Sequence, residues 1–326
     1  MSKNIYISGH NGMVGSAIYR NIKKNYPNDT IIVQSRSELD LLDQSKTLNF
    51  FDKNKIDEVY LCAAKVGGIK ANSSYPYEFL YENMQIELNL INSAIKKNIP
   101  KLLFLGSSCI YPKYSKQPIN EEYLLSGKLE ETNEPYALAK ISGIKLCESA
   151  NIQFGLDYRS LMPTNLYGPG DLFDLENSHV LPALISKFVD AVQNNNEKVI
   201  IWGSGMARRE FLHVDDLANA AVYFLNMDKN KFWEMNNENV SHINVGTGLD
   251  ISILELAQLI KEITNFKGDI SLDKTKPDGM PQKLLNIEKA LSYGWKPEIS
   301  FSDGLRKTIE WYKENKSNNT LRGLSS

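Results

Sequence analysis

The chain has 326 residues, and its 37 lysines and arginines nearly balance its 39 aspartates and glutamates, for a net charge of −2. This balance argues against nucleic acid or an anionic membrane as partner, because such polyanions are bound by strongly basic surfaces. The three cysteines, Cys62, Cys109 and Cys147, are too few and too scattered for a disulfide framework, so we expect a reducing compartment.

The start of the chain and its hydropathy exclude membrane classes. The first ten residues, MSKNIYISGH, hold one lysine but no apolar segment of the kind that a secretory signal carries. No apolar run approaches the roughly 20 residues that span a bilayer. We therefore expect a cytoplasmic protein, and its length predicts roughly two domains.

Short apolar runs alternate with amphipathic stretches through the first half of the chain. Near-continuous apolar runs are typical of parallel strands buried on both faces, and the alternation predicts a doubly wound, Rossmann-type α/β sheet. The predicted strands cover 4–8, 30–34, 58–62, 101–106 and 157–162, and the predicted helices cover 13–25, 44–54, 77–97 and 135–155.

Beyond about residue 165 the pattern loosens, which predicts a smaller lobe. We divide the chain into a dinucleotide-binding domain over 1–165 and a substrate-binding lobe over 166–326 that is interleaved with the last sheet elements. In the lobe we predict strands over 198–202 and 242–246, helices from Pro182, from Asp215 and over 252–264, and a polar, frayed tail over 314–326.

A glycine-rich turn follows the first predicted strand. In GHNGMVG, Gly9, Gly12 and Gly15 permit a tight turn and a close backbone approach, so that the next helix begins at a pyrophosphate. Its place between a strand and a helix favours a dinucleotide site over a purely structural turn.

The end of the second strand selects the dinucleotide. An NAD site usually ends this strand in an acidic residue that accepts hydrogen bonds from the ribose. Here the strand ends VQSRSE, with Arg36 near that point and Glu38 beyond it. Because a guanidinium pairs with a 2′-phosphate, we favour NADP, the alternative being a solvated surface arginine.

Two further motifs point to carbonyl reduction. EPYALAK places Tyr136 and Lys140 four residues apart on one helix face, where an ammonium favours the phenolate and lowers the pKa of the tyrosine. The fourth strand ends in SSCIYP, which puts Ser107 at the ligand edge of the sheet beside Tyr136. A serine hydroxyl there can hydrogen-bond a substrate oxygen that gains negative charge.

With these motifs the chain resembles the extended short-chain dehydrogenase/reductase family. AAKVGGI, LGSSCIYP, EPYALAKISGIKLCES, MPTNLYGP, NSHVLPALI, REFLHVDD and INVGTG resemble its GDP-sugar epimerase/reductase branch over nearly the whole chain. The resemblance implies that GDP-4-keto-6-deoxy-D-mannose is epimerised at C3 and C5 and then reduced at C4 by NADPH to GDP-L-fucose.

That reaction implies roles for Cys109 and His179. Inversion beside a ketone needs one group to remove a proton and another to return it on the opposite face, and thiols and imidazoles exchange protons near neutrality. By the resemblance Cys109 is the base and His179 the acid. The alternatives are a buried, inert cysteine and a structural histidine.

The resemblance implies further contacts and a homodimer formed through helices near 77–97 and 136–155. The substrate is a GDP-sugar, and no metal site is expected. Besides Ser107, Cys109 and Asn165, the expected substrate contacts are Ser108, Lys187, Trp202, Arg209 and Asp278. Besides the residues named above, the expected NADP contacts are Asn11, Met13, Val14, Leu39, Asp40, Leu41, Ala63, Ala64, Leu105, Gly106, Lys140, Pro163, Asn165, Leu166 and His179.

The chain also departs from the pattern. Asn11 stands where relatives often have arginine, and Met206, Ala207 and Arg208 occupy a stretch that borders the substrate. A GDP-4-keto-heptose, reduced at C4 with or without epimerisation, is therefore an alternative substrate. Two other readings are an NAD-retaining sugar-nucleotide 4-epimerase or dehydratase, and a non-enzymatic dinucleotide sensor, against which the intact Ser107, Tyr136 and Lys140 argue.

Overall fold

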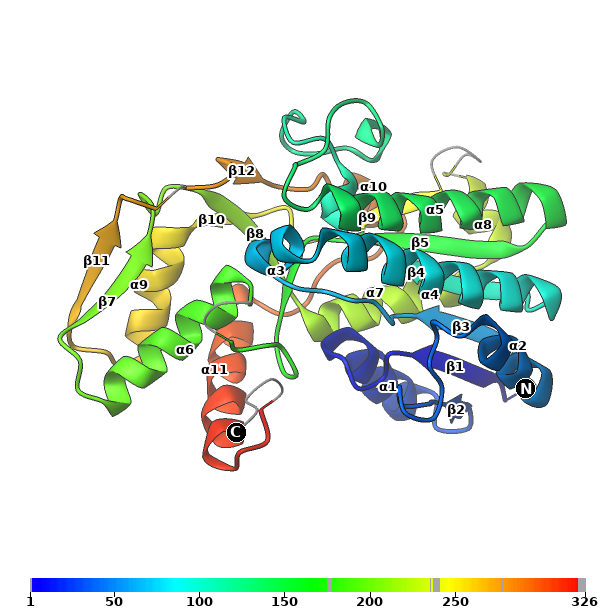
Figure 1. Ribbon diagram of the computed structural model, residues 1–326, viewed down its shortest axis with the longest axis horizontal. Helices are drawn as coiled ribbons and strands as arrows, with labels where there is room; N and C mark the ends of the chain where they lie inside the picture. The colour runs from blue at the N-terminus through cyan, green and yellow to red at the C-terminus, as the bar shows by residue number, and fades with distance from the viewer. Residues whose placement is uncertain (1, 175–177, 235, 237–240, 277, 322–326) are drawn as a thin grey trace.

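A computed structural model describes residues 2–174, 178–234, 236, 241–276 and 278–321. Its centre is a six-stranded, wholly parallel sheet in the order β2-β1-β3-β4-β5-β9 (Figure 1). This confirms the predicted doubly wound α/β class. The strands are β1 (Asn4–Ser8), β2 (Thr30–Ile32), β3 (Glu58–Leu61), β4 (Lys101–Leu105), β5 (Asp157–Pro163) and β9 (His242–Val245).

Helices cover both faces of this sheet. In β1, Ile5 and Ile7 belong to one apolar core and Tyr6 to another, because successive strand residues point to opposite faces. The first core is closed by α1 (Met13–Asn25) and α7 (Val214–Asn226). The second is closed by α2 (Gln44–Lys53), α4 (Pro76–Lys96) and α5 (Glu134–Phe154).

The predicted helix limits hold within a few residues because local signals set them. In α5, Pro135 lies in the first turn, where its missing N–H costs no hydrogen bond, and Gly155 ends the helix in the left-handed conformation at φ 66°. The short helix α3 (Ile69–Ser74) precedes α4 and was not predicted.

The sheet order reverses between β1 and β3. From β1 the chain crosses to β2 on one side and then returns to β3 on the other. Ligands of doubly wound sheets bind at such a switch point, beyond the carboxyl ends of the strands. The glycine turn after β1 and the segment after β3 flank this point.

The second half builds a lobe beside the carboxyl edge of the sheet (Figure 1). One small sheet joins β6 (Asn165–Tyr167), β8 (Arg208–His213), β10 (Asp250–Ser252) and β12 (Gln282–Lys283). A parallel pair joins β7 (Lys198–Trp202) and β11 (Asp269–Asp273). A third apolar core packs them against α6 (Val180–Gln193), α9 (Ile253–Thr264) and α11 (Phe301–Ser317).

The chain after residue 165 does not stay in the lobe. β9 pairs with β5 in the large sheet, and α7 packs against its face. Two short helices, α8 (Lys229–Glu234) and α10 (Glu288–Ser292), lie in this part of the chain. The predicted frayed tail is wrong up to Ser317, because α11 continues to that residue, and residues 322–326 lie outside the described chain.

None of the helices formed by the described residues combines the length and apolar character that crossing a membrane requires.

Candidate active site

The glycine turn after β1 is built for a close approach. Gly9 has φ +70°, a conformation that L side chains rarely adopt. A Cβ at Gly15 would lie 2.3 Å from the Gly9 carbonyl oxygen, so only glycine lets α1 start this close to the strand. Gly12 caps α1 without any side-chain hydrogen bond, which leaves the first amides of the helix available to an anion.

Arg36 lies in the loop that follows β2 and is exposed to solvent. Its side chain is 76% exposed and its nearest acidic partner, Glu82, is 3.9 Å away. The neighbouring Glu38 accepts hydrogen bonds from the Ser35 amide at 2.8 Å and hydroxyl at 2.7 Å, which lower its pKa. Glu38 thus binds its own turn, and the ion pair with Glu82 is the one that Arg36 makes with the described residues, a weak and exposed pair.

Several of the expected NADP contacts lie beyond the carboxyl ends of β1, β2 and β3. Leu39 is buried, and the Leu41 carbonyl accepts a hydrogen bond from Asn89 Nδ2 at 2.7 Å. The Ala63 amide lies 3.2 Å from Ser8 Oγ, which joins the end of β1 to the segment after β3. The remaining expected residues of this part, Asn11, Met13, Val14, Asp40 and Ala64, are at least partly exposed at the turns after β1, β2 and β3.

Ser107 and Tyr136 are brought together as predicted. Ser107 follows β4 and accepts a hydrogen bond from the Cys109 amide at 3.2 Å. Tyr136 lies in the first turn of α5, with its phenol close enough to Ser107 for the serine side chain to act on its pKa. The spacing of Tyr136 and Lys140 predicts a lowered pKa for this phenol. Instead burial raises the pKa of Tyr136, Cys109 and Glu87 raise it further, and only the Ser107 side chain opposes them.

Besides burial, the environment of Lys140 explains why this ammonium does not lower the pKa of Tyr136. The Lys140 ammonium is buried. It lies 5.8 Å from the centre of the Tyr136 ring and 4.9 Å from the centre of the Phe104 ring. Its nearest charged partner is Glu87 on α4, at 3.1 Å, with side-chain exposures of 3% and 1%. A cation paired at this distance has little net charge left to act on the phenol.

Glu87 was missed by the sequence analysis. A glutamate in an amphipathic helix usually faces solvent, and nothing local marks this one as buried. The need for such a residue comes from another part of the chain. A lysine on the buried face of α5 needs a counter-charge, and α4 is the helix that packs beside α5.

A thiol and a cation meet beside Ser107, and an imidazole lies within the electrostatic reach of that cation. Asn133 Nδ2 donates to Cys109 Sγ at 3.6 Å, and Lys283 Nζ donates to the same sulfur at 3.5 Å. His179, the residue preceding α6, is exposed. Its pKa is lowered by the surrounding protein atoms and then by the Lys283 ammonium. Lys283, on the two-residue strand β12, was also missed.

The residues expected near the nicotinamide lie at the ends of β4 and β5. Leu105, Gly106 and Pro163 are buried there, and a Cβ at Gly106 would lie 2.3 Å from the side chain of Met162. Asn165 donates from Nδ2 to the Glu210 carbonyl at 2.8 Å, which ties β6 to β8. Leu166 packs partly buried against the first core.

The expected substrate contacts in the lobe are more exposed. Trp202 is 61% exposed, and the ammonium of Lys187 lies 5.5 Å from its ring centre. Arg209 donates from Nη1 to the Met280 carbonyl at 2.7 Å. Asp278 accepts from the Ser204 amide at 2.6 Å and thereby closes the turn after β7. Ser108, by contrast, is buried in the first turn after β4.

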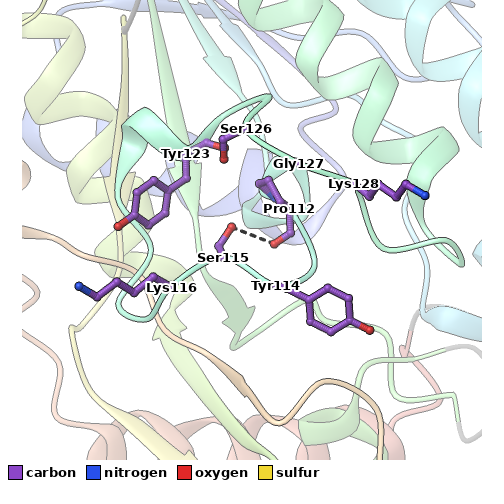
Figure 2. A pocket seen from close by; sticks show the side chains of 8 residues that line it. All are labelled: Pro112, Tyr114, Ser115, Lys116, Tyr123, Ser126, Gly127 and Lys128. Atoms are coloured by element: carbon purple, nitrogen blue, oxygen red, sulfur yellow. Dashed lines mark hydrogen bonds between the residues drawn. The ribbon is translucent and has the colours of Figure 1, made fainter.

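A separate surface pocket lies on the segment between β4 and α5 (Figure 2). Pro112, Tyr114, Ser115, Lys116, Tyr123, Ser126, Gly127 and Lys128 line it. Ser115 Oγ donates to the Pro112 carbonyl at 2.9 Å, and Figure 2 shows both lysines extending away from the pocket. None of the predicted site residues lines it, so it is distinct from the centre at Ser107.

The sequence of the chain is similar to those of known proteins over nearly its whole length. Residues 5–246 match the model of the NAD dependent epimerase/dehydratase family. GDP-L-fucose synthase of Escherichia coli (strain K12) is 52% identical over 316 residues, covering 97% of this chain and 98% of that protein.

Two solved structures from Campylobacter jejuni are similar in fold. A GDP-6-OMe-4-keto-L-xylo-heptose reductase has a TM-score of 0.89 at 36% identity, covering 96% of this chain and 98% of that one. A GDP-mannoheptose C4 reductase with NADP bound has a TM-score of 0.86 at 38% identity, with the same coverage of 96% and 98%.

Proposed function

Because the chain belongs to the NAD dependent epimerase/dehydratase family, in the branch that contains the GDP-L-fucose synthases, we propose that it converts GDP-4-keto-6-deoxy-D-mannose to GDP-L-fucose. It is an NADP-dependent enzyme of the oxidoreductase and epimerase type. The observation that carries the proposal is that the thiol of Cys109 and the phenol of Tyr136 meet at one centre beside Ser107.

The residues at the switch point fit a dinucleotide. A pyrophosphate could accept hydrogen bonds from the uncapped amides at the start of α1. Because Gly9 and Gly15 have no side chains, the backbone of the turn can come close to it. Arg36 has no strong partner among the described residues and is free to pair with a 2′-phosphate. Lys140, Pro163, Asn165, Leu166 and His179 would then border the nicotinamide half.

For the reduction step, Tyr136 is the proton donor. The chemistry supplied by bound NADPH is hydride transfer to C4 of the keto sugar. Tyr136 gives its proton to O4 while Ser107 hydrogen-bonds the same oxygen. The raised pKa of Tyr136 suits this direction, because the phenol must carry its proton when the substrate arrives.

For the epimerisation steps, Cys109 is the base and His179 the acid. The Cys109 thiolate takes the proton from C3 or C5, and the electron pair of that C–H bond moves toward O4, where Tyr136 and Ser107 stabilise the enolate. His179 then protonates the same carbon on its opposite face. The Lys283 ammonium, 3.5 Å from the sulfur, offers a counter-charge to the thiolate.

The nucleotide diphosphate is held in the lobe. Lys187 and Arg209 supply the positive charge that a near-neutral chain must place locally, and Trp202 offers an exposed aromatic face. Asp278 accepts hydrogen bonds from the sugar or base, as Ser108 and Asn165 do nearer the reacting carbons.

The deciding experiment offers NADPH and GDP-4-keto-6-deoxy-D-mannose in deuterium oxide. We expect deuterium at C3 and C5 of a GDP-L-fucose product, because both carbons exchange before hydride transfer traps the sugar. NADPH oxidation without deuterium at either carbon would leave only the reductase. No NADPH oxidation with this substrate would overturn the proposal.

A second candidate is C4 reduction of a GDP-4-keto-heptose. Heptose reductases are among the similar structures, and Met206, 68% exposed between β7 and β8, belongs to the stretch that we expect to border the substrate. A higher kcat/KM for the GDP-4-keto-heptose than for the 6-deoxyhexose would favour it.

We also propose that the enzyme is a cytoplasmic homodimer. Tyr75, Tyr77 and Tyr81, at and just before α4, are 55%, 72% and 49% exposed, and the rings of Tyr77 and Tyr81 stack with centres 5.5 Å apart. Such an aromatic patch suits pairing of α4 and α5 with those of a second copy. Light scattering at micromolar concentration tests this, and a monomeric mass would contradict it.

A further inference from the structure

The reduction centre contains one buried acid to which none of the steps above gives a role. Glu87 lies on α4, next to α5, with its side chain 1% exposed. Its single charged contact among the described residues is the Lys140 ammonium at 3.1 Å. A buried carboxylate is costly unless it is paired, so its place here calls for an explanation.

The surrounding packing preserves this pair. A Cβ at Gly143, on α5, would lie 2.8 Å from Glu87 Oε2 and 2.4 Å from the Phe104 ring. The glycine therefore makes room for the carboxylate and for the ring over which Lys140 lies. The side chains of two helices and one strand thus fix the position of the ammonium.

The charges that face Glu87 come from several elements. Helix α5 contributes Lys140, Tyr136 and Cys147. Cys62, which follows β3, is close enough to Lys140 for the ammonium to lower its pKa. Burial raises the pKa of Glu87, and Lys140 opposes that rise. Lys140 is the only cation of this group, so the carboxylate acts mainly on Lys140 and, beyond it, on Tyr136.

We propose that Glu87 is a positioning residue for ketone reduction: its carboxylate holds the Lys140 ammonium in the buried site and keeps Tyr136 in the protonated form that donates to the substrate. Two effects combine. Without a counter-charge a buried ammonium gives up its proton more readily, and without the nearby negative charge the phenol ionises more readily. The second effect would shut down reduction at a lower pH, because an ionised phenol has no proton to give to the substrate, and the first would release the ammonium from its position beside Tyr136.

The test is the pH dependence of kcat for NADPH oxidation by the full-length enzyme. For Glu87→Gln we expect the alkaline limb of the profile to move down by about one pH unit or more, with kcat about tenfold lower at pH 8. Glu87→Asp keeps the charge but withdraws it by one methylene, so its limb should lie between those of Gln and wild type.

A matched control separates positioning from stability. Glu148 on α5 is also buried and pairs with Lys145 at 2.6 Å and Ser241 Oγ at 3.0 Å, away from Tyr136. Glu148→Gln should lower the melting temperature without moving the alkaline limb. If Glu87→Gln does not fold, the limb of Glu87→Asp decides the matter. An alkaline limb that stays in place in the folded Glu87 variants would overturn the proposal.

This inference rests on the proposed reduction, and the two fail in different ways. If the wild type does not reduce the 6-deoxyhexose substrate, the proposed function falls, and the same limb is measured with the GDP-4-keto-heptose. If the wild type reduces its substrate but the Glu87 variants keep its profile, only the role of Glu87 falls.

Discussion

The reduction centre and the substrate lobe differ in what holds their functional side chains. Lys140 and Glu87 are 3% and 1% exposed and have each other as partners, whereas Trp202 in the lobe is 61% exposed. Within the described part of the chain, Arg209 and Asp278 form hydrogen bonds to backbone groups. The first region is organised before any ligand arrives, so substitutions there should change kcat, and those in the lobe should change KM.

The largest effect is expected at the organised centre. Tyr136→Phe removes the proton donor and should lower NADPH oxidation by about 10²- to 10⁴-fold, while the Kd for NADPH stays near the wild-type value. Tyr114→Phe, at an 85% exposed tyrosine that lines the separate pocket of Figure 2, is the matched control and should keep full activity. Near-normal turnover by Tyr136→Phe would contradict the expectation that substitutions in the reduction centre lower kcat.

Cys109→Ser should divide the two activities within that centre. Serine nearly matches cysteine in size, but its hydroxyl is a poor base at neutral pH, so deuterium incorporation at C3 and C5 should fall by about 10²-fold or more. Slow reduction of the unepimerised sugar should survive, because Ser107, Tyr136 and Lys140 remain.

The thiol of Cys147 provides the control for that division. It lies in the second apolar core, 0% exposed, so Cys147→Ala should cost stability but keep both activities. Full deuterium exchange by Cys109→Ser would reject its role as the base.

Arg36 belongs to the dinucleotide-binding domain but is exposed, like the functional side chains of the lobe, so its substitution should change KM. Arg36→Ala should raise KM for NADPH about 10- to 100-fold and KM for NADH much less, because a charge-assisted phosphate contact contributes about 1.5–3 kcal/mol. Arg306→Ala, at an exposed arginine on α11, is the control. Equal changes for both cofactors would show that Arg36 does not contact the 2′-phosphate.

The smallest expected effect concerns Lys283, which lies where the two regions meet. Its ammonium lowers the pKa of His179, so Lys283→Met should raise that pKa by less than about one unit. NMR titration of the imidazole resonances measures it, and the four histidines of the chain make assignment through His179→Gln practical. Lys276→Met, which changes a lysine beside Trp202, should leave the pKa unmoved. A lowered pKa in Lys283→Met would contradict the expected sign.

The sheet could be predicted because its strands are continuous apolar runs, whereas strand β8 could not. Its residues Arg208, Arg209 and Glu210 look like a charged loop. Arg208 is paired with Asp250 at 2.7 Å, and Glu210 accepts from the amides of Thr247 and Gly248 at 2.6 and 2.8 Å. These partners come from distant segments, so no local pattern reveals the strand.

The candidate site divides in the same way. The spacing of Tyr136 and Lys140 placed both on one helix face, and the strand end placed Ser107 beside them. Glu87 and Lys283 escaped notice because each is defined by a partner 53 or 174 positions away in the sequence, Lys140 and Cys109 respectively. The predicted direction of the Tyr136 pKa was wrong because burial raises that pKa most, and Cys109 and Glu87 add to the rise; none of these is visible in the local sequence.

The return of β9 to the large sheet constrains how the protein can be cut. β9 covers the outer side of β5, a strand whose seven residues are all buried. A fragment that stops at residue 165 would expose the backbone groups of β5 as an unprotected sheet edge, and it would also lose the apolar cover of α7. Such an edge is a template for pairing between molecules. Limited proteolysis in the lobe should therefore yield a nicked protein that stays together, and the isolated amino-terminal half should aggregate.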